Sequence, residues 1–226
     1  MTNFSQEWDE CYRKNTQMSI WPWSDLVSYV MRYARPDSPK YRVLELGCGA
    51  GANIPFFSHL GVDYCAIEGS PSIVGKLWEK FPELKKQIVV GDFTKEIPFE
   101  GQFDLIFDRA SLTHNSTKAI MQTIKLIKES LKLGSKFIGI DWFSTLHSDY
   151  NGGMKAEDNY TRCNYINGQF TNVGRVHFSD KGHLKELFSD FEIEVMELKT
   201  VHREIPQDNH TFAAWNLVAR KAERND

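Results

Sequence analysis

The feature that most constrains the fold is residues 43–51, where an apolar run is followed at once by three glycines at alternate positions. The run itself, residues 41–46, is short and mostly apolar, as is typical of a strand buried in a parallel sheet. Pro55 stands near the start of the next segment, and proline is favoured in the first turn of a helix. The sequence therefore predicts a buried strand, a glycine-rich turn and the beginning of a helix in succession.

Such a corner can bind a nucleotide, because glycine lets the backbone approach a ligand and the first N–H groups of a helix can donate to an anion. Gly47, Gly49 and Ala52 also satisfy the dinucleotide fingerprint, in which a pyrophosphate lies at the helix N-terminus. Glu45, two residues before the first glycine, would repel a pyrophosphate and attract an amino group. The corner therefore favours a ligand that carries an ammonium group and no phosphate.

An acidic residue followed by Gly-x-Gly-x-Gly resembles the first motif of the class I S-adenosylmethionine-dependent methyltransferases, whose cofactor carries an ammonium group and no phosphate. The resemblance covers residues 41–141 with clear motifs and the end of the chain more loosely. Strands and helices also alternate regularly as far as residue 141, which is typical of a doubly wound sheet. We therefore expect an α/β fold with a mostly parallel, seven-stranded sheet, helices on both faces and an antiparallel C-terminal strand.

Two further acidic residues follow predicted strands. Glu68 comes directly after residues 62–67, and its carboxylate suits the two hydroxyls of a ribose in a methyltransferase or in a dehydrogenase. Asp92 and Phe93 come after residues 87–90, where the family has an acid for the adenine amino group and an apolar neighbour for the ring. A dehydrogenase has less need of an acid there. The resemblance implies cofactor contacts from Glu45, Gly47, Cys48, Gly49, Gly51, Asn53, Glu68, Gly69, Ser70, Asp92, Phe93, Asp108 and Arg109.

Candidate catalytic residues follow the fourth predicted strand, residues 101–108, because the ends of central strands face the substrate in such sheets. A neutral amine or hydroxyl acceptor must lose a proton, which a nearby base assists. His114, with an ordinary pKa near neutrality, and Asp108 are the candidates. Alternatively, His114 only packs against the helix that begins near Ser116. Asp108 and Asp141 lack the third acidic ligand of a magnesium site, so no metal is predicted.

The expected secondary structure is simple to state. Two helices are expected within residues 3–35, the second of them capped by Ser24. Further helices are expected over residues 53–60, 70–81, 117–133 and 179–188, and strands over residues 41–46, 62–67, 87–90, 101–108, 136–141, 191–198 and 212–220.

We expect one domain over residues 1–226. Its expected parts are an N-terminal helical cap (1–40), a cofactor-binding half (41–141), a substrate lid (142–178), and a closing helix and strands (179–226). The lid is inferred because a long irregular segment inside a compact domain is usually functional or disordered, and its aromatic content argues against disorder. Trp21 and Trp23 either plug the edge of the sheet or belong to the cover of the active site, and the sequence leaves their role open.

Composition narrows the function. Lys and Arg number 27 and Asp and Glu 30, so a net charge of −3 gives no reason to expect a nucleic-acid partner. No apolar run could span a bilayer, the N-terminus carries no secretory signal, and the four cysteines lack ligand spacing, which indicates reduced thiols in the cytoplasm. The oligomeric state is left open.

The predicted function is methyl transfer from S-adenosylmethionine to an oxygen or nitrogen atom of a polar small molecule. A sugar or an amino compound is favoured, because the expected lid is rich in Tyr, Asn and Arg. Two alternatives remain: an NAD(P)-dependent oxidoreductase on the same kind of sheet, and a protein that binds S-adenosylmethionine without catalysis.

Overall fold

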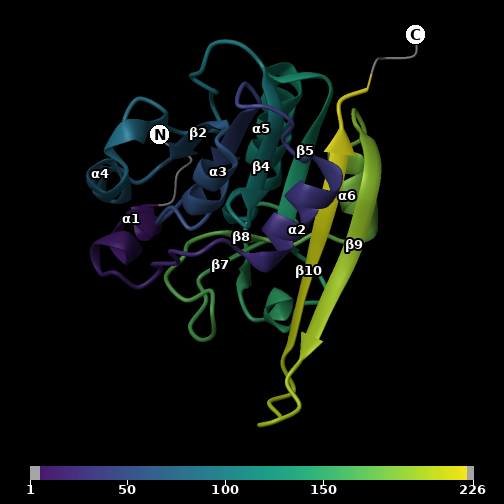
Figure 1. The fold of residues 1–226 in the computed structure, drawn as a ribbon. Coiled ribbons are helices and arrows are strands. Elements are labelled where there is room, and N and C mark those ends of the chain that lie inside the picture. Colours follow the sequence, from purple (N-terminus) through teal and green to yellow (C-terminus); the bar gives the residue numbers. More distant parts are fainter. Residues whose placement is uncertain (1–5, 223–226) are drawn as a thin grey trace.

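Seven strands form one sheet at the centre of the structure, a computed structural model that describes residues 6–222 (Figure 1). They are β1 (Arg42–Leu46), β2 (Asp63–Glu68), β3 (Ile88–Val90), β4 (Phe103–Arg109), β5 (Leu131–Phe143), β9 (Glu192–His202) and β10 (Thr211–Arg220). Their order is β3-β2-β1-β4-β5-β10-β9, and β10 runs antiparallel to both of its neighbours while the other pairs are parallel. The predicted fold class is confirmed.

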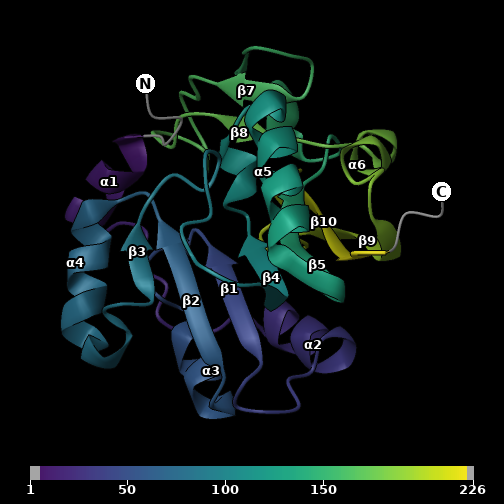
Figure 2. The ribbon, with the colours of Figure 1, turned by 90° about the horizontal axis from the view of Figure 1, so that it is seen from above.

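Helices cover both faces of this sheet (Figure 2). They are α2 (Ser24–Tyr33), α3 (Ile54–Leu60), α4 (Pro71–Lys80), α5 (Thr117–Ser130) and α6 (Lys181–Leu187), whereas α1 (Gln6–Arg13) packs against α4 at the end of the sheet. Alternate residues of β1 divide between two cores. Leu44 and Leu46 pack with apolar residues of α5 and α6, whereas Val43 packs with those of α2, α3 and α4. Burial on both faces explains why β1 reads as an almost continuous apolar run.

Three helix starts carry the side-chain caps that position the loops around the strand ends. The Ser70 hydroxyl accepts from Ile73 N–H at the start of α4, as Ser116 and Asp180 do for α5 and α6. The predicted cap at Ser24 is wrong. Ser24 is already the first residue of α2, and Trp23 precedes it without a side-chain cap. The part of the first helix predicted within residues 3–5 lies outside the described residues.

The boundary between α5 and β5 differs from the prediction. α5 ends at Ser130 rather than at residue 133, and β5 begins at Leu131 rather than at residue 136. Leu131 pairs with Phe103 across the sheet and is fully buried there, so a sheet contact overrides the local helical pattern. Met121, which fits the helical spacing, is 57% exposed and does not belong to the buried face.

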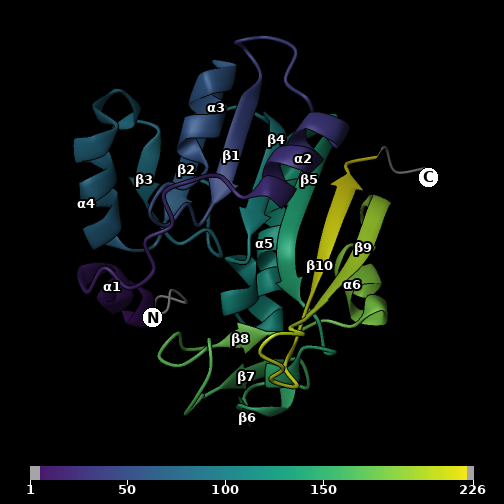
Figure 3. The ribbon, with the colours of Figure 1, turned by 60° about the horizontal axis from the view of Figure 1, so that its bottom comes forward.

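Residues 142–178 are more regular than predicted. They contain a short 3₁₀ turn, η3 (Ser148–Asn151), and a small antiparallel sheet of β6 (Met154–Lys155), β7 (Thr161–Cys163) and β8 (Val176–His177). Phe170 and Phe178 belong to the apolar core of this segment, which Phe143 at the end of β5 joins. Figure 3 shows the segment beyond the ends of the central strands. Within residues 6–222, no helix combines the length and the apolar character that crossing a membrane requires.

Candidate functional site

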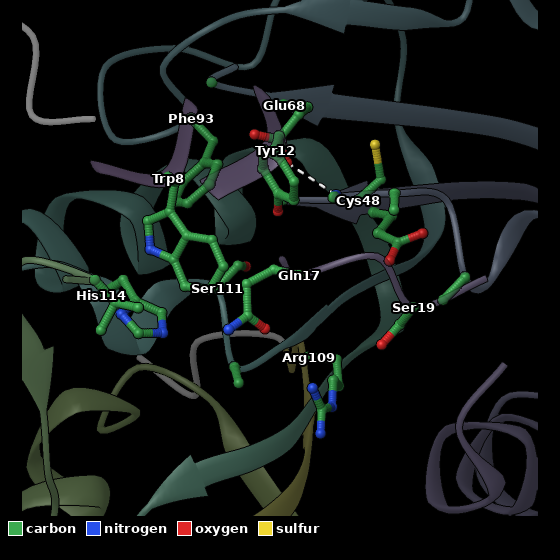
Figure 4. Close-up of a pocket in the computed structure, with 18 of the residues that line it drawn as sticks. Trp8, Tyr12, Gln17, Ser19, Cys48, Glu68, Phe93, Arg109, Ser111 and His114 are labelled. Carbon is green, nitrogen blue, oxygen red and sulfur yellow. Dashed lines mark hydrogen bonds between the residues drawn. The ribbon is translucent and has the colours of Figure 1, made fainter. Parts of the chain in front are cut away.

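A cavity of about 320 Å³ lies where the glycine turn meets the strand ends, α1 and the segment after β5 (Figure 4). Ligands of open α/β sheets bind in this crevice, outside the carboxyl ends of the strands. The structure brings eleven residues predicted from the sequence to its wall: Glu45, Gly47, Cys48, Gly49, Asn53, Glu68, Gly69, Asp92, Phe93, Arg109 and His114. Three predicted residues, Gly51, Ser70 and Asp108, do not line it.

The glycine turn needs its glycines for two reasons. Gly47 and Gly49 adopt left-handed φ angles of 73° and 51°. A Cβ atom on Gly47 would lie 2.4 Å from Ser111 Cβ, and one on Gly49 would lie 2.8 Å from the Tyr12 hydroxyl. Gly51 also has a left-handed φ angle, of 78°, and a Cβ there would meet Leu77. Neighbouring side chains thus pack directly onto the backbone of the turn, which only glycine allows.

Glu68 ties the glycine turn to the end of β2. Its carboxylate accepts the N–H of Gly49 at 2.9 Å and the N–H of Ser70 at 3.0 Å. The residue is only 4% exposed and faces the cavity, and burial raises the pKa of its carboxyl. Each carboxylate oxygen has lone pairs to spare after one hydrogen bond, so Glu68 can still accept from a ligand hydroxyl.

Glu45 is buried beside the turn. It accepts hydrogen bonds from Asn53 Nδ2, at 2.7 Å, and from the Tyr64 hydroxyl. Asn53 lines the same cavity, and its Oδ1 atom is buried without a hydrogen-bond partner among the described residues. A buried acceptor without a donor costs free energy. An amino group bound here would supply the missing donor.

Because Glu45 is buried, the free energy of unfolding should depend on pH. Burial raises its pKa from an ordinary value of 4.5 to about 7, so the folded protein holds a proton that the unfolded chain has lost between these pH values. The free energy of unfolding should therefore fall with rising pH, by about 3 kcal/mol over this window. Glu45→Gln lacks this loss, and its stability relative to the wild type should increase from pH 4.5 to pH 7. Urea unfolding of both proteins at these two pH values measures the difference, which a constant value would contradict.

Asp92 and Phe93 lie at the end of β3. Asp92 Oδ1 accepts from Thr94 N–H at 3.1 Å and from its hydroxyl at 2.6 Å, and Lys95 Nζ lies 3.3 Å from Oδ2. Phe93 reaches toward the glycine turn, because its Cε1 would lie 3.7 Å from a Cβ on Gly47. An acceptor and an aromatic ring thus stand side by side at this end of the cavity.

Asp108 is fully buried and turned away from the cavity. Its Oδ2 accepts the N–H groups of Ser111 and Leu112, at 2.8 and 2.9 Å, and its Oδ1 accepts Trp142 Nε1–H at 2.6 Å. Burial raises its pKa to about 6. Asp108 therefore holds the turn after β4 and does not line the cavity. Ser70 is similarly occupied by Ile73 N–H and by Asp9.

Arg109 forms part of the opposite wall. Its guanidinium donates to Asp141 through Nε, at 3.1 Å, and through Nη2, at 2.9 Å. The indole ring of Trp23 covers it, with 3.6 Å from the guanidinium carbon to the ring centroid. Trp23 lines the cavity, whereas Trp21 is 72% exposed and does not. These placements favour a covering role for Trp23 over a plug of the sheet edge.

Trp23 and Trp21 provide a matched pair of variants. Trp23→Ala should lower the free energy of unfolding by about 1 kcal/mol, since it removes a cation–π contact on a partly desolvated guanidinium. Trp21→Ala should change it by less than about 0.5 kcal/mol, the usual range for an exposed side chain. Chemical denaturation of both variants checks this, and equal losses would contradict the assignment.

His114 faces the cavity in a defined tautomer. Its Nδ1 lies 3.0 Å from the carbonyl oxygen of Arg175, which can only accept, so Nδ1 carries the proton and Nε2 keeps a lone pair. The ring of Trp8 packs edge-on against it at 4.8 Å. Burial lowers the pKa of His114 to about 4, so the imidazole is uncharged at neutral pH. A neutral imidazole with a free nitrogen can accept a proton from a bound molecule.

Several residues of the cavity wall were not predicted from the sequence. The most prominent are Trp8 and Tyr12 of α1, which lie beside the cavity in Figure 4. α1 is held to α4 by Asp9, which accepts from the Ser70 hydroxyl and from Ser72 N–H at 3.2 Å. Trp8 and Tyr12 are four residues apart, a spacing that places both on one helix face and could have marked them. Further missed residues are Gln17, Ser19, Ser111, Asn115 and Phe212, whereas Phe143, Gln169, Phe170 and Val173 belong to the predicted lid, residues 142–178.

Sequence comparison identifies relatives of the region that forms this cavity. A family model described as a methyltransferase domain matches residues 43–134. A curated, uncharacterized methyltransferase of Synechocystis sp. (strain ATCC 27184 / PCC 6803 / Kazusa) is 30% identical over 106 residues, which make up 46% of this chain and 48% of the relative. The match thus spans about half of the relative's length.

Solved structures share the whole fold. A methyltransferase of Methanosarcina mazei, described as S-adenosylmethionine-dependent, is 16% identical with a TM-score of 0.66, covering 89% of this chain and 99% of its own. The 1,6-didemethyltoxoflavin-N1-methyltransferase of Burkholderia thailandensis, solved with 1,6-didemethyltoxoflavin and S-adenosylhomocysteine, is 16% identical with a TM-score of 0.64, covering 96% of this chain and 85% of its own. At these identities the similarity concerns the fold.

Proposed function

We propose that the chain is a class I S-adenosylmethionine-dependent methyltransferase. On this premise, it transfers a methyl group to an oxygen or nitrogen atom of a polar small molecule. The observation that carries the proposal is the pairing of two features in one cavity. A glycine turn flanked by buried carboxylates lies on one side, and a neutral histidine with a free ring nitrogen lies on the other.

The cofactor half of the cavity fits S-adenosylmethionine. Glu68 would accept from the ribose hydroxyls, and Asp92 with Phe93 would hold the adenine amino group and ring. The Asn53 amide oxygen, buried and without a donor among the described residues, would accept from the amino group near Glu45. A pyrophosphate in the same place would lie against two buried carboxylates, which disfavours an NAD(P)-dependent oxidoreductase.

Bound S-adenosylmethionine supplies an activated methyl group, so the protein has to align the acceptor and exclude water. Trp8 and Tyr12 of α1 cover one side of the cavity, and the segment after β5 covers another with Phe143 and Phe170. His114 Nε2 would take the acceptor's proton, since the carbonyl of Arg175 already fixes the proton on Nδ1. Asp108 is left out of this scheme, because it has no access to the cavity.

The acceptor half of the cavity combines polar and aromatic side chains. Arg109, His114, Asn115 and Gln169 offer hydrogen-bonding groups, and Phe143, Phe170 and Phe212 offer flat apolar faces. This mixture suits a polar small molecule such as a sugar or an amino compound. In this proposal, residues 142–178 are the substrate lid and residues 1–40 the helical cap of a single domain. The net charge of −3 and four unpaired cysteines support a cytoplasmic enzyme without nucleic-acid or membrane partners.

A binding and turnover experiment tests the proposal. S-adenosylmethionine and S-adenosylhomocysteine should raise the melting temperature of the protein, and NAD should not. Incubation with labelled S-adenosylmethionine and pools of polar metabolites should then yield S-adenosylhomocysteine and one labelled product. Stabilisation by NAD alone would replace the proposal with an oxidoreductase. Stabilisation by S-adenosylmethionine without product from any pool would favour a binding protein without catalysis.

A further inference from the structure

Three side chains that could bind a metal ion lie close together behind Phe143, Phe170 and Phe212, the aromatic wall of the cavity. His147 and Asp149 stand at η3, just after β5, and His210 immediately precedes β10. One ligating atom from each of the three lies within 4.8 Å of the others. His210 Nε2 is 3.4 Å from Asp149 Oδ1, and His147 Nδ1 is 4.0 Å from Asp149 Oδ2.

These distances suit one shared metal ion. In a tetrahedral zinc site with bonds of about 2.0–2.1 Å, neighbouring ligand atoms are separated by about 3.3 Å. The 3.4 Å between His210 Nε2 and Asp149 Oδ1 matches this separation, and the distance between His147 Nδ1 and Asp149 Oδ2 is 4.0 Å. Because the histidines approach different oxygens of the carboxylate, binding one ion requires the Asp149 side chain to rotate or to bind through both oxygens. Two imidazoles and one carboxylate are also a ligand set that zinc and its neighbours in the first transition row accept, whereas magnesium and calcium prefer oxygen alone.

Asp149 carries an unsatisfied group aimed at this position. Its Oδ2 atom is buried and has no hydrogen-bond partner among the described residues, although a buried carboxylate oxygen without a donor or cation is costly. His147 Nδ1 lies 4.0 Å from this oxygen and has no proton to offer it, because it accepts the Asp149 main-chain N–H at 3.1 Å. A cation between the side chains would satisfy Oδ2.

His147 already has the tautomer that a ligand needs. Because Nδ1 accepts an N–H, its lone pair points toward Asp149, and a cation on Nδ1 would replace that hydrogen bond. On the other side of the ring, Nε2 lies 2.7 Å from the side-chain amide nitrogen of Gln169, and a flip of that amide, which exchanges its oxygen and nitrogen, lets the oxygen accept the Nε2 proton. Metal-binding histidines commonly donate their second N–H to such a partner, which fixes the ring.

The surroundings connect this group to the cavity. The side chain of His147 is fully buried and packs against Phe143, Phe170 and Phe212, with ring centroids 5.3–6.0 Å apart. The same three phenylalanines line the cavity. Residues 142–178 and the β9–β10 hairpin therefore meet at these ligands, and a bond through one ion would join them.

We propose that His147, Asp149 and His210 bind one divalent transition-metal ion, with zinc the best match. This ion would connect the segment after β5 to the β9–β10 hairpin, next to the phenylalanines that line the cavity. Solvent completes the coordination. No metal was predicted from the sequence, because that prediction considered only the carboxylates at strand ends. His147 and His210 are more than sixty residues apart in the sequence, and only the fold brings them together.

Metal titration of the untagged full-length protein tests this. After treatment with a chelator and its removal, the wild type should bind one equivalent of Zn²⁺ by calorimetry and should give the intense visible absorption of tetrahedral Co²⁺ when cobalt is the probe. Asp149→Asn and His210→Ala should weaken binding by more than about tenfold, a loss that even outer-shell partners of a metal can cause. The exposed His59 lies on α3, so His59→Ala controls for adventitious binding.

The outcomes are decisive in both directions. His210 is partly exposed, so His210→Ala should fold, as its circular dichroism would confirm, even if the buried His147 tolerates no change. Zn²⁺ should raise the melting temperature of the wild type and of His59→Ala but not of His210→Ala. Equal zinc affinity in the wild type and His210→Ala, or no saturable site in the wild type, would overturn the proposal. None of these readouts depends on methyl transfer.

Discussion

Glu68→Ala is expected to weaken the binding of S-adenosylmethionine and S-adenosylhomocysteine by about 3 kcal/mol, roughly a hundredfold. The substitution removes the carboxylate proposed for the ribose hydroxyls. It also leaves the N–H groups of Gly49 and Ser70 without their acceptor, so the turn that forms the floor of the cavity loses its tie to β2. Isothermal titration calorimetry with S-adenosylhomocysteine measures the loss directly.

Two comparisons make this result interpretable. Glu79→Ala changes an exposed acid on α4 and should leave the affinity unchanged. Glu68→Gln keeps one amide oxygen as an acceptor and should fall between the wild type and Glu68→Ala. An affinity of Glu68→Ala within twofold of the wild type would show that the carboxylate is a structural tie without a ligand contact.

His114→Ala is expected to lower the turnover number by about a hundredfold or more, the range for losing a general base, with cofactor affinity retained. The reason is the free Nε2 atom that His114 presents to the cavity. Turnover would be followed as S-adenosylhomocysteine formed with an acceptor from the metabolite pools. His59→Ala, on the exposed side of α3, provides the matched control.

The pH profile offers an independent check on His114. Burial lowers its pKa to about 4, so the unprotonated form is present throughout the neutral range and is lost only as the pH falls toward that value. At saturating S-adenosylmethionine, where the titration of Glu45 no longer affects cofactor binding, the wild-type turnover number should therefore be flat on the acid side down to about pH 5 and show no inflection at the ordinary histidine value near 6.5. An unaltered rate in His114→Ala would instead return this residue to a packing role beside Trp8.

Much of the cofactor half was predictable because its signals are local. The run before Gly47, the alternate glycines, and the acids after β2 and β3 are short patterns whose meaning depends on neighbours in the chain. Glu68 and Asp92 consequently line the cavity as expected. Asp108 occupies the same kind of position at the end of β4, yet Trp142, 34 residues away, donates a hydrogen bond that holds it in the core. No local pattern distinguishes these cases.

The remaining differences also arise from distant contacts. α1 lies at the cavity because Asp9 binds Ser70 and Ser72 at the start of α4, about sixty residues further along the chain. β5 begins early because Leu131 pairs with Phe103, although helix propensity would continue α5. The grouping of His147 with His210 likewise depends on how β10 is placed in the sheet. Single-sequence patterns carry no information about such pairs.

The position of α1 has a consequence for how the protein would exchange its ligands. An eight-residue helix is marginal in isolation, so α1 depends on its docking against α4 for its shape. Tyr12 places its hydroxyl against the turn at Gly49, and a nucleoside bound there would touch both. By thermodynamic reciprocity, a ligand that favours the docked helix is itself retained by it. Docked α1 would thereby slow the release of S-adenosylhomocysteine. Cleavage by a protease between α1 and α2 should accordingly become slower as the cavity is occupied.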